Sequence, residues 1–153
     1  MDTKILYYKI YEFEVTSNDY VNWAIEMLLN NHSTYSLNIL ASLNEPLNIF
    51  EVEEYFNRTL NELNLSVPSH QECAESYLIH LAKKIIDNEN NAIDFAYEMY
   101  KTVREHFINE ELSVWYEISE MIDDYRYGDN IGKITKDVLI TKIVEEAKKH
   151  INL

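Results

Sequence analysis

The sequence predicts an all-α fold in a single domain that spans residues 1–153. Hydrophobic residues make up 46% of the chain, enough for one buried core, and they recur with the 3.6-residue period of amphipathic helices. Two glycines and two prolines are too few for the many turns of a β-sandwich. Together these observations predict six or seven antiparallel helices joined by short loops.

The first segment with a clear pattern, residues 9–15, alternates with a period of two. Aromatic and β-branched side chains fall on one face and glutamates on the other, which predicts a short N-terminal strand. A short amphipathic helix is the alternative interpretation, because a lone strand needs a partner and the sequence points to none. The side chains of the apolar face are Tyr11, Phe13 and Val15.

Three helices are expected next, at residues 16–29, 34–43 and 48–63. Each begins at a side chain that can accept a hydrogen bond from the first turn. These side chains are Thr16 or Ser17, Thr34 and Asn48. Glu51 follows Asn48 by three residues, which is the spacing of a capping pair.

The remaining helices are expected at residues 69–85, 92–107, 112–125 and 135–147. Ser69 and Glu72 have the spacing of a capping box, while Asn91 and Thr135 are expected to cap the second and the last of these helices. The helix starts from residue 48 onward recur about every 20 to 22 residues, so helical pairs recur with the period of HEAT repeats. The expected architecture is therefore a helical bundle or a short HEAT-like α-solenoid.

The chain is strongly acidic, with 27 acidic and 13 basic residues and a formal charge of −14. Between residues 45 and 129 acidic residues outnumber basic ones about three to one, whereas the balance is reversed from residue 133 onward. Such a field repels nucleic-acid phosphates and anionic lipid, and it attracts basic proteins. The charge therefore predicts a basic protein partner, with no binding to nucleic acid or to a membrane.

The sequence predicts a cytoplasmic location. Cys73 is the single cysteine, so the chain has no internal disulfide, and we expect its thiol to be a buried small apolar group. No apolar run approaches the roughly 20 residues that a membrane span needs. The first residues lack the long apolar stretch of a secretory signal. The richness in Asn, Ile and Tyr is typical of an AT-rich bacterial genome.

No motif in the chain predicts catalysis, a cofactor or a metal. A phosphate-binding loop has four residues between its two glycines and a Ser or Thr directly after its lysine. In the loop from Gly128 to Lys133 only three residues separate the glycines, and Ile134 follows the lysine. A calcium loop that begins at Asp87 would place Ala92 where the sharp turn requires glycine. The five histidines are scattered, and no pair has the i, i+4 spacing of a helical zinc site. We therefore expect no enzyme activity.

The strongest candidate for a binding surface is the outward face of the helix expected at residues 112–125. Glu117, Glu120 and Asp124 stand at i, i+3 and i+7 and share one face, while Trp115 is expected to face the core. Tyrosines beside acids resemble the anchors of protein interfaces. Acidic Glu110, Glu111 and Asp129 flank this helix. The expected partner-binding residues are Tyr116, Glu117, Glu120, Asp123, Asp124, Tyr125 and Tyr127.

Two stretches resemble uncharacterised small acidic helical proteins of bacteria, some of them similar to immunity proteins of polymorphic toxin systems. They are LASLNEPLNIFEVEEYF (residues 40–56) and WYEISEMIDDY (residues 115–125). The resemblance implies a protein that neutralises a basic toxin domain, and it supplies no functional residues of its own.

Residues and resemblance together predict a non-catalytic protein-binding module that is a monomer or a homodimer. Two alternatives remain. The first is a structural homodimer in which exposed aromatic side chains pair across a two-fold axis. The second is a small hydrolase that uses clustered carboxylates.

Overall fold

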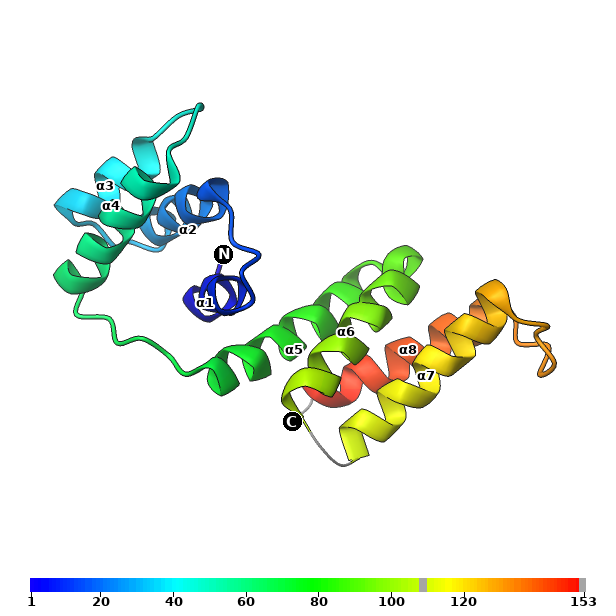
Figure 1. The fold of residues 1–153 in the computed structure, drawn as a ribbon. Coiled ribbons are helices and arrows are strands. Elements are labelled where there is room, and N and C mark those ends of the chain that lie inside the picture. The colour runs from blue at the N-terminus through cyan, green and yellow to red at the C-terminus, as the bar shows by residue number, and fades with distance from the viewer. Residues whose placement is uncertain (108–109, 152–153) are drawn as a thin grey trace. The chain divides into compact units, whose positions relative to one another are not determined.

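A computed structural model describes residues 1–107 and 110–151, with the side chains of residues 110–112 left aside (Figure 1). The described residues form helices and no strand, which confirms the all-α prediction. The helices are α1 (Thr3–Tyr11), α2 (Ser17–Leu29), α3 (Tyr35–Ser42), α4 (Ile49–Glu62), α5 (His70–Asp87), the short 3₁₀ turn η1 (Glu89–Asn91), α6 (Ala92–His106), α7 (Glu110–Tyr127) and α8 (Lys136–Ile151).

The predicted N-terminal strand is wrong, because this part of the chain forms helix α1. Asp2 caps that helix by accepting a hydrogen bond from the backbone N–H of Lys4 at 2.8 Å, and four consecutive side chains of its middle are buried. The alternating residues lie at its end and beyond it, where Phe13 has a φ of 57° and is 95% exposed. The short alternation thus belongs to a helix end and a turn.

The additional helix α1 brings the described α-helices to eight, one more than the upper limit of seven that the sequence predicted.

Most of the predicted helix starts are confirmed by their caps. Thr16, Thr34, Asn48, Ser69 and Thr135 each accept a hydrogen bond from a backbone N–H in the first turn, at 2.9–3.3 Å. Asn91 differs, because its side chain makes no capping bond and η1 leads directly into α6. Local capping chemistry therefore sets most of the helix starts.

The chain folds as two compact units, residues 1–73 and residues 74–153, which we call unit 1 and unit 2. Helices α1 to α4 belong to unit 1 and α6 to α8 to unit 2, while α5 begins in unit 1 and continues into unit 2. Cys73 is fully buried, and this burial raises the pKa of its thiol, as expected of a structural residue. The single domain expected over residues 1–153 stays a prediction, because two compact units can unfold together or separately.

Unit 1 is built around aromatic side chains. Helix α2 packs on α1, α3 and α4, and Trp23 of α2 is fully buried. Its ring meets that of Phe56 edge-on, with the centroids 5.0 Å apart, and its indole N–H donates to the hydroxyl of Thr3 at 3.0 Å. Because a buried indole N–H needs an acceptor, this bond ties α1 to the core of the unit.

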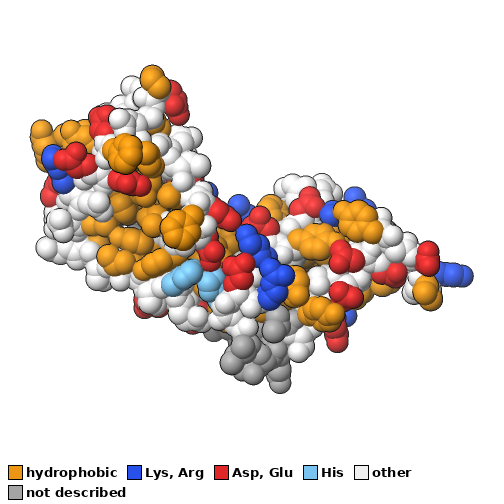
Figure 2. Space-filling view, viewed as in Figure 1, with side chains coloured by type: hydrophobic (Ala, Val, Ile, Leu, Met, Phe, Trp, Pro, Cys, Tyr) orange, Lys and Arg blue, Asp and Glu red, His pale blue; other side chains and the backbone are white. Residues whose placement is uncertain are grey.

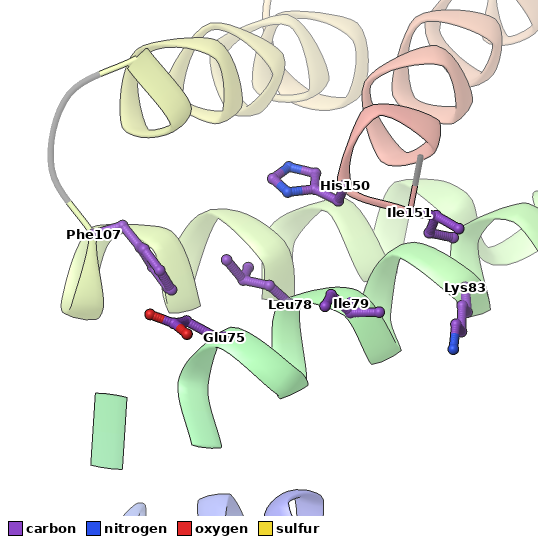
Figure 3. A pocket seen from close by; sticks show the side chains of 7 residues that line it. All are labelled: Glu75, Leu78, Ile79, Lys83, Phe107, His150 and Ile151. Carbon is purple, nitrogen blue, oxygen red and sulfur yellow. The ribbon is translucent and has the colours of Figure 1, made fainter. Parts of the chain in front are cut away.

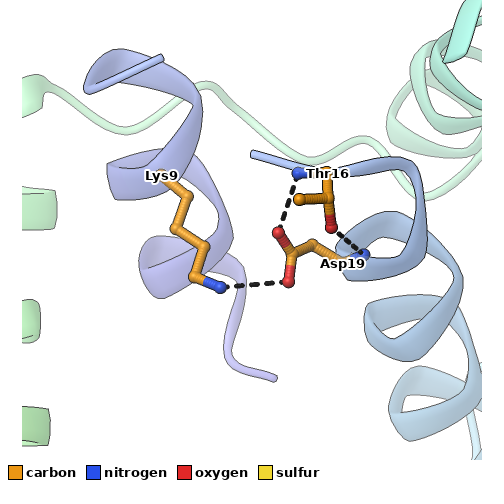
Figure 4. A network of polar contacts seen from close by, with 3 residues as sticks. All are labelled: Lys9, Thr16 and Asp19. Carbon is orange, nitrogen blue, oxygen red and sulfur yellow. Dashed lines mark hydrogen bonds and ion pairs between the residues drawn. The ribbon is translucent and has the colours of Figure 1, made fainter. Parts of the chain in front are cut away.

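A polar network also joins α1 to α2 (Figure 4). The carboxylate of Asp19 accepts hydrogen bonds from the backbone N–H of Thr16 at 2.8 Å and from the Lys9 ammonium at 3.0 Å. Burial of Asp19 opposes its ionisation, but these hydrogen bonds outweigh that effect and lower the pKa of the carboxyl group. The capping box of α2 therefore also anchors α1.

We expect Asp19→Ala to lower the free energy of unfolding by about 1.5 kcal/mol at pH 7, since it removes a cap bond and a charge-assisted bond. The folded-state pKa of Asp19 lies below the ordinary value of 3.8, so the stability that it contributes is complete at pH 7 and is lost as the pH falls through the folded pKa. Urea unfolding at pH 7 and at pH 3 measures the difference between the wild type and the variant. An equal difference at both values would contradict the assignment, and Asp129→Ala, in an exposed loop, is the control.

Unit 2 has a continuous hydrophobic core, to which α5, α6, α7 and α8 all contribute. Helix α6 packs on both α7 and α8. Trp115 of α7 is buried in this core, which confirms that it faces inward. Among the described residues, no helix is both long enough and apolar enough to cross a membrane.

Candidate functional site

The candidate surface lies on the part of α7 that faces away from the core of unit 2. Trp115, Ile118 and Ile122 are buried, so the opposite side of the helix carries the polar side chains. Glu117 and Glu120 are exposed, and Asp124 is half-buried. The three acids therefore share the outward face as their spacing predicted. The side chains of Glu110 and Glu111 lie outside the described residues.

At the C-terminal end of α7, Gly128 leaves room for the Asp124 carboxylate. The N–H of Gly128 donates to the carbonyl oxygens of Asp123 and Asp124, both at 3.1 Å. A Cβ atom at Gly128 would lie 2.6 Å from the Asp124 carboxylate and 3.0 Å from its Cα. A side chain there would therefore displace the last acid of the outward face.

The tyrosines of α7 differ in how far they reach the surface. Tyr127 is 79% exposed and Tyr116 is 49% exposed, so both present large parts of their rings to a partner. Tyr125 is half-buried and packs against the hydrophobic core, so it presents less of its ring. The exposed rings of the candidate site are thus those of Tyr116 and Tyr127.

A polar network connects α7 to α6. The Tyr97 hydroxyl of α6 donates a hydrogen bond to the Asp123 carboxylate of α7. Burial, together with this bond, raises the pKa of Tyr97 to about 12, so the phenol stays protonated and remains a donor at neutral pH. Arg126 pairs with Asp94 at 2.8 Å, and its guanidinium lies 5.6 Å from the centre of the Tyr97 ring. These contacts hold Asp123 and Arg126 in place.

Tyrosines of both helices form what we call the tyrosine strip, composed of Tyr97, Tyr100, Tyr116 and Tyr127. The ring of Tyr100 on α6 lies 6.0 Å from that of Tyr116 on α7, and the guanidinium of Arg104 lies 5.5 Å from the Tyr100 ring. Figure 2 shows hydrophobic, acidic and basic side chains interleaved over α6 and α7. The surface thus combines aromatic rings with fixed charges.

The contribution of α6 to this surface does not follow from the sequence pattern. The helical period predicts Tyr100 in the core and gives no role to Tyr97 or Arg104. These three residues stand at i, i+3 and i+7, so they share one helix face, and that spacing was the available signal. Which neighbouring helix this face meets depends on tertiary packing, which the spacing does not encode.

The acids of the outward face and the tyrosine strip together have the chemistry of a surface that can contact another protein. Carboxylates at the outward face attract cationic side chains from solution, and rigid tyrosine rings supply area that a partner can bury at a low cost in conformational entropy. A comparison of the chain with protein-family models, with curated proteins and with solved structures found no match.

Proposed function

We propose that this protein is a non-catalytic protein-binding module that recognises a basic partner through the outward face of α7 and the tyrosine strip. The observation that carries the proposal is the proximity of exposed rings to exposed acids on one helix. Tyr116 and Tyr127 are 49% and 79% exposed, and Glu117 and Glu120 are exposed beside them. Scattered exposed apolar side chains are ordinary, but rings flanked by fixed charges are typical of interfaces.

The acids and the tyrosines would contribute differently to binding. The carboxylates would raise the association rate by attracting a basic surface, with an effect that falls as the salt concentration rises. The tyrosines would become buried and slow dissociation. Helix α7 has 18 residues, so it is about 27 Å long. That length, together with the neighbouring face of α6, is sufficient for an interface of standard size.

More specifically, we propose that the basic partner is a toxin domain and that this protein acts as its immunity protein. The resemblance of residues 115–125 to proteins similar to immunity proteins supports a toxin domain as the partner, since that stretch includes Glu117, Glu120 and Asp124. Blocking a toxin requires no chemistry in the inhibitor, only a tight and fast association.

The proposal is tested by capturing partners from a lysate of the source organism on the immobilised full-length chain. The wild type is expected to retain a basic protein, identified by mass spectrometry, and Tyr127→Ala to reduce its capture at least tenfold, because alanine removes an anchoring ring. Tyr35→Ala is the matched control, since Tyr35 is 76% exposed but lies on α3 in unit 1.

Two results would contradict the proposal: no protein retained by the wild type, or equal retention by the wild type and Tyr127→Ala. Light scattering of the purified chain at two concentrations distinguishes the alternative, in which the exposed tyrosines pair two copies of this chain. A mass that doubles with concentration in the wild type, but not in Tyr127→Ala, would favour that homodimer.

A further inference from the structure

Unit 2 contains a cavity of about 510 Å³ that is separate from the residues of the tyrosine strip. It is lined by Glu75, Leu78, Ile79, Lys83, Phe107, His150 and Ile151. These residues come from α5, from the residue that follows α6 and from the last turn of α8 (Figure 3). The volume lies within the range of about 300–1,000 Å³ that is common for small-molecule sites.

One wall of the cavity is a ridge of α5 with opposite charges at its ends. Glu75, Ile79 and Lys83 stand four residues apart, so they follow one another along one helix face. The rise of a helix places Glu75 about 12 Å from Lys83 along the axis. Figure 3 shows Phe107 near the Glu75 end and Ile151 near the Lys83 end. Between the charges the wall is apolar.

The end of the cavity near Lys83 is basic, although the whole chain carries a charge of −14. Lys83 is exposed and forms no ion pair with any residue that the structure describes. Lys148 is also exposed and stands one helical turn before Ile151, which places it on the same side of α8. Among the described residues that line the cavity, Lys83 is the one lysine or arginine, so an anionic group would find complementary charge at this end.

We propose that this cavity binds a medium-chain monocarboxylate. The carboxylate pairs with Lys83, and the alkyl chain lies over Ile79 and Leu78 toward Phe107. Glu75 does not prevent this orientation, because it lies about 12 Å from Lys83 along the axis of α5. That distance exceeds the electrostatic screening length of about 8 Å at physiological ionic strength. A ligand in the reverse orientation would bring its carboxylate against Glu75. The site is independent of the proposed function on α7.

The cavity has a built-in spectroscopic reporter. The indole N–H of Trp115 donates to Nε2 of His150 at 3.0 Å, and the two rings are stacked with their centroids 5.9 Å apart. His150 in turn lines the cavity. A ligand that contacts the His150 ring therefore alters the surroundings of Trp115. The chain has two tryptophans, so Trp23→Phe leaves Trp115 as the single emitting indole.

The test is calorimetric titration of the full-length wild type with butyrate, hexanoate, octanoate and decanoate. We expect the dissociation constant to fall about fourfold for each methylene added, because each buried CH₂ contributes about 0.8 kcal/mol. Lys83→Gln should weaken the binding of decanoate about fivefold, in line with a partly exposed ion pair. Lys136→Gln, which removes the same charge from the first turn of α8, should leave binding unchanged. Decanoate should also shift the Trp115 emission in the Trp23→Phe variant.

Several outcomes would overturn the proposal. They are no heat of binding with millimolar decanoate, equal affinity for decanol and decanoate, equal loss of affinity in Lys83→Gln and Lys136→Gln, or an unchanged Trp115 emission at saturation. Decanol is the informative comparison, because it has the alkyl chain without the charge. None of these outcomes bears on the binding of a protein to α7, so the two proposals fail or succeed separately.

Discussion

Replacing Phe56 with alanine is expected to lower the free energy of unfolding by about 4 kcal/mol, a large part of the stability of an ordinary domain. The ring of Phe56 is buried and meets three other aromatic rings: those of Tyr7, Tyr20 and Trp23, with centroids 5.8, 4.9 and 5.0 Å away. Alanine would leave a cavity at the point where α1, α2 and α4 contribute side chains to the same core. Urea unfolding followed by circular dichroism measures the loss.

Phe50→Ala is the matched control, since Phe50 is also on α4 but is 79% exposed. We expect it to change the free energy of unfolding by less than about 0.5 kcal/mol. A similar loss in both variants would show that the ring of Phe56 is not packed as described.

The same unfolding experiment tests the prediction of one domain. Trp23 reports on unit 1 and Trp115 on unit 2, so variants that keep one tryptophan each follow one unit. In a single cooperative domain, Phe56→Ala shifts both transitions to the same lower urea concentration. A shift confined to the Trp23 signal would show that the two units unfold separately, and the prediction of a single domain would be wrong.

Reversing the charge of the outward face of α7 is expected to slow the association with a basic partner about 100-fold at low salt. The variant carries Glu117→Lys, Glu120→Lys and Asp124→Lys together, which replaces three attractive charges with three repulsive ones. The effect should diminish as the salt concentration rises, because screening weakens both the attraction and the repulsion. Surface plasmon resonance with the captured partner, at two salt concentrations, measures the association rate.

A matched control separates a local effect from the change in net charge. Glu51→Lys, Glu89→Lys and Glu145→Lys together change the net charge by the same amount at exposed positions on α4, η1 and α8. We expect this control to slow association by less than about tenfold. Equal effects in the two triple variants would assign the attraction to the overall charge of the protein and not to the face of α7.

The helices were predictable from the sequence to the extent that neighbouring residues determine them. A cap such as Thr16 or Thr34 bonds to an N–H only three residues away, at 3.3 Å in each case, so its effect is present in the order of the residues. The inward position of Trp115 follows from the helical period in the same way. The N-terminal segment misled because the alternation of Tyr11, Phe13 and Val15 spans only five residues, which is too short to distinguish a strand from a helix end.

The two candidate binding sites were decided by tertiary structure. Tyr97 and Asp123 are 26 residues apart, and only the packing of α6 on α7 brings the hydroxyl to the carboxylate. The cavity likewise combines Lys83 with Phe107 and Ile151 from two other parts of the chain. A periodic pattern predicts which side of a helix is buried, but not which helix covers that side. The hydrophobic effect is non-directional, so any apolar surface can cover it. The sequence by itself therefore determined the helices from α2 onward, most of their caps and the acidic face of α7, while the packing of unit 2 decided the tyrosine strip and the cavity.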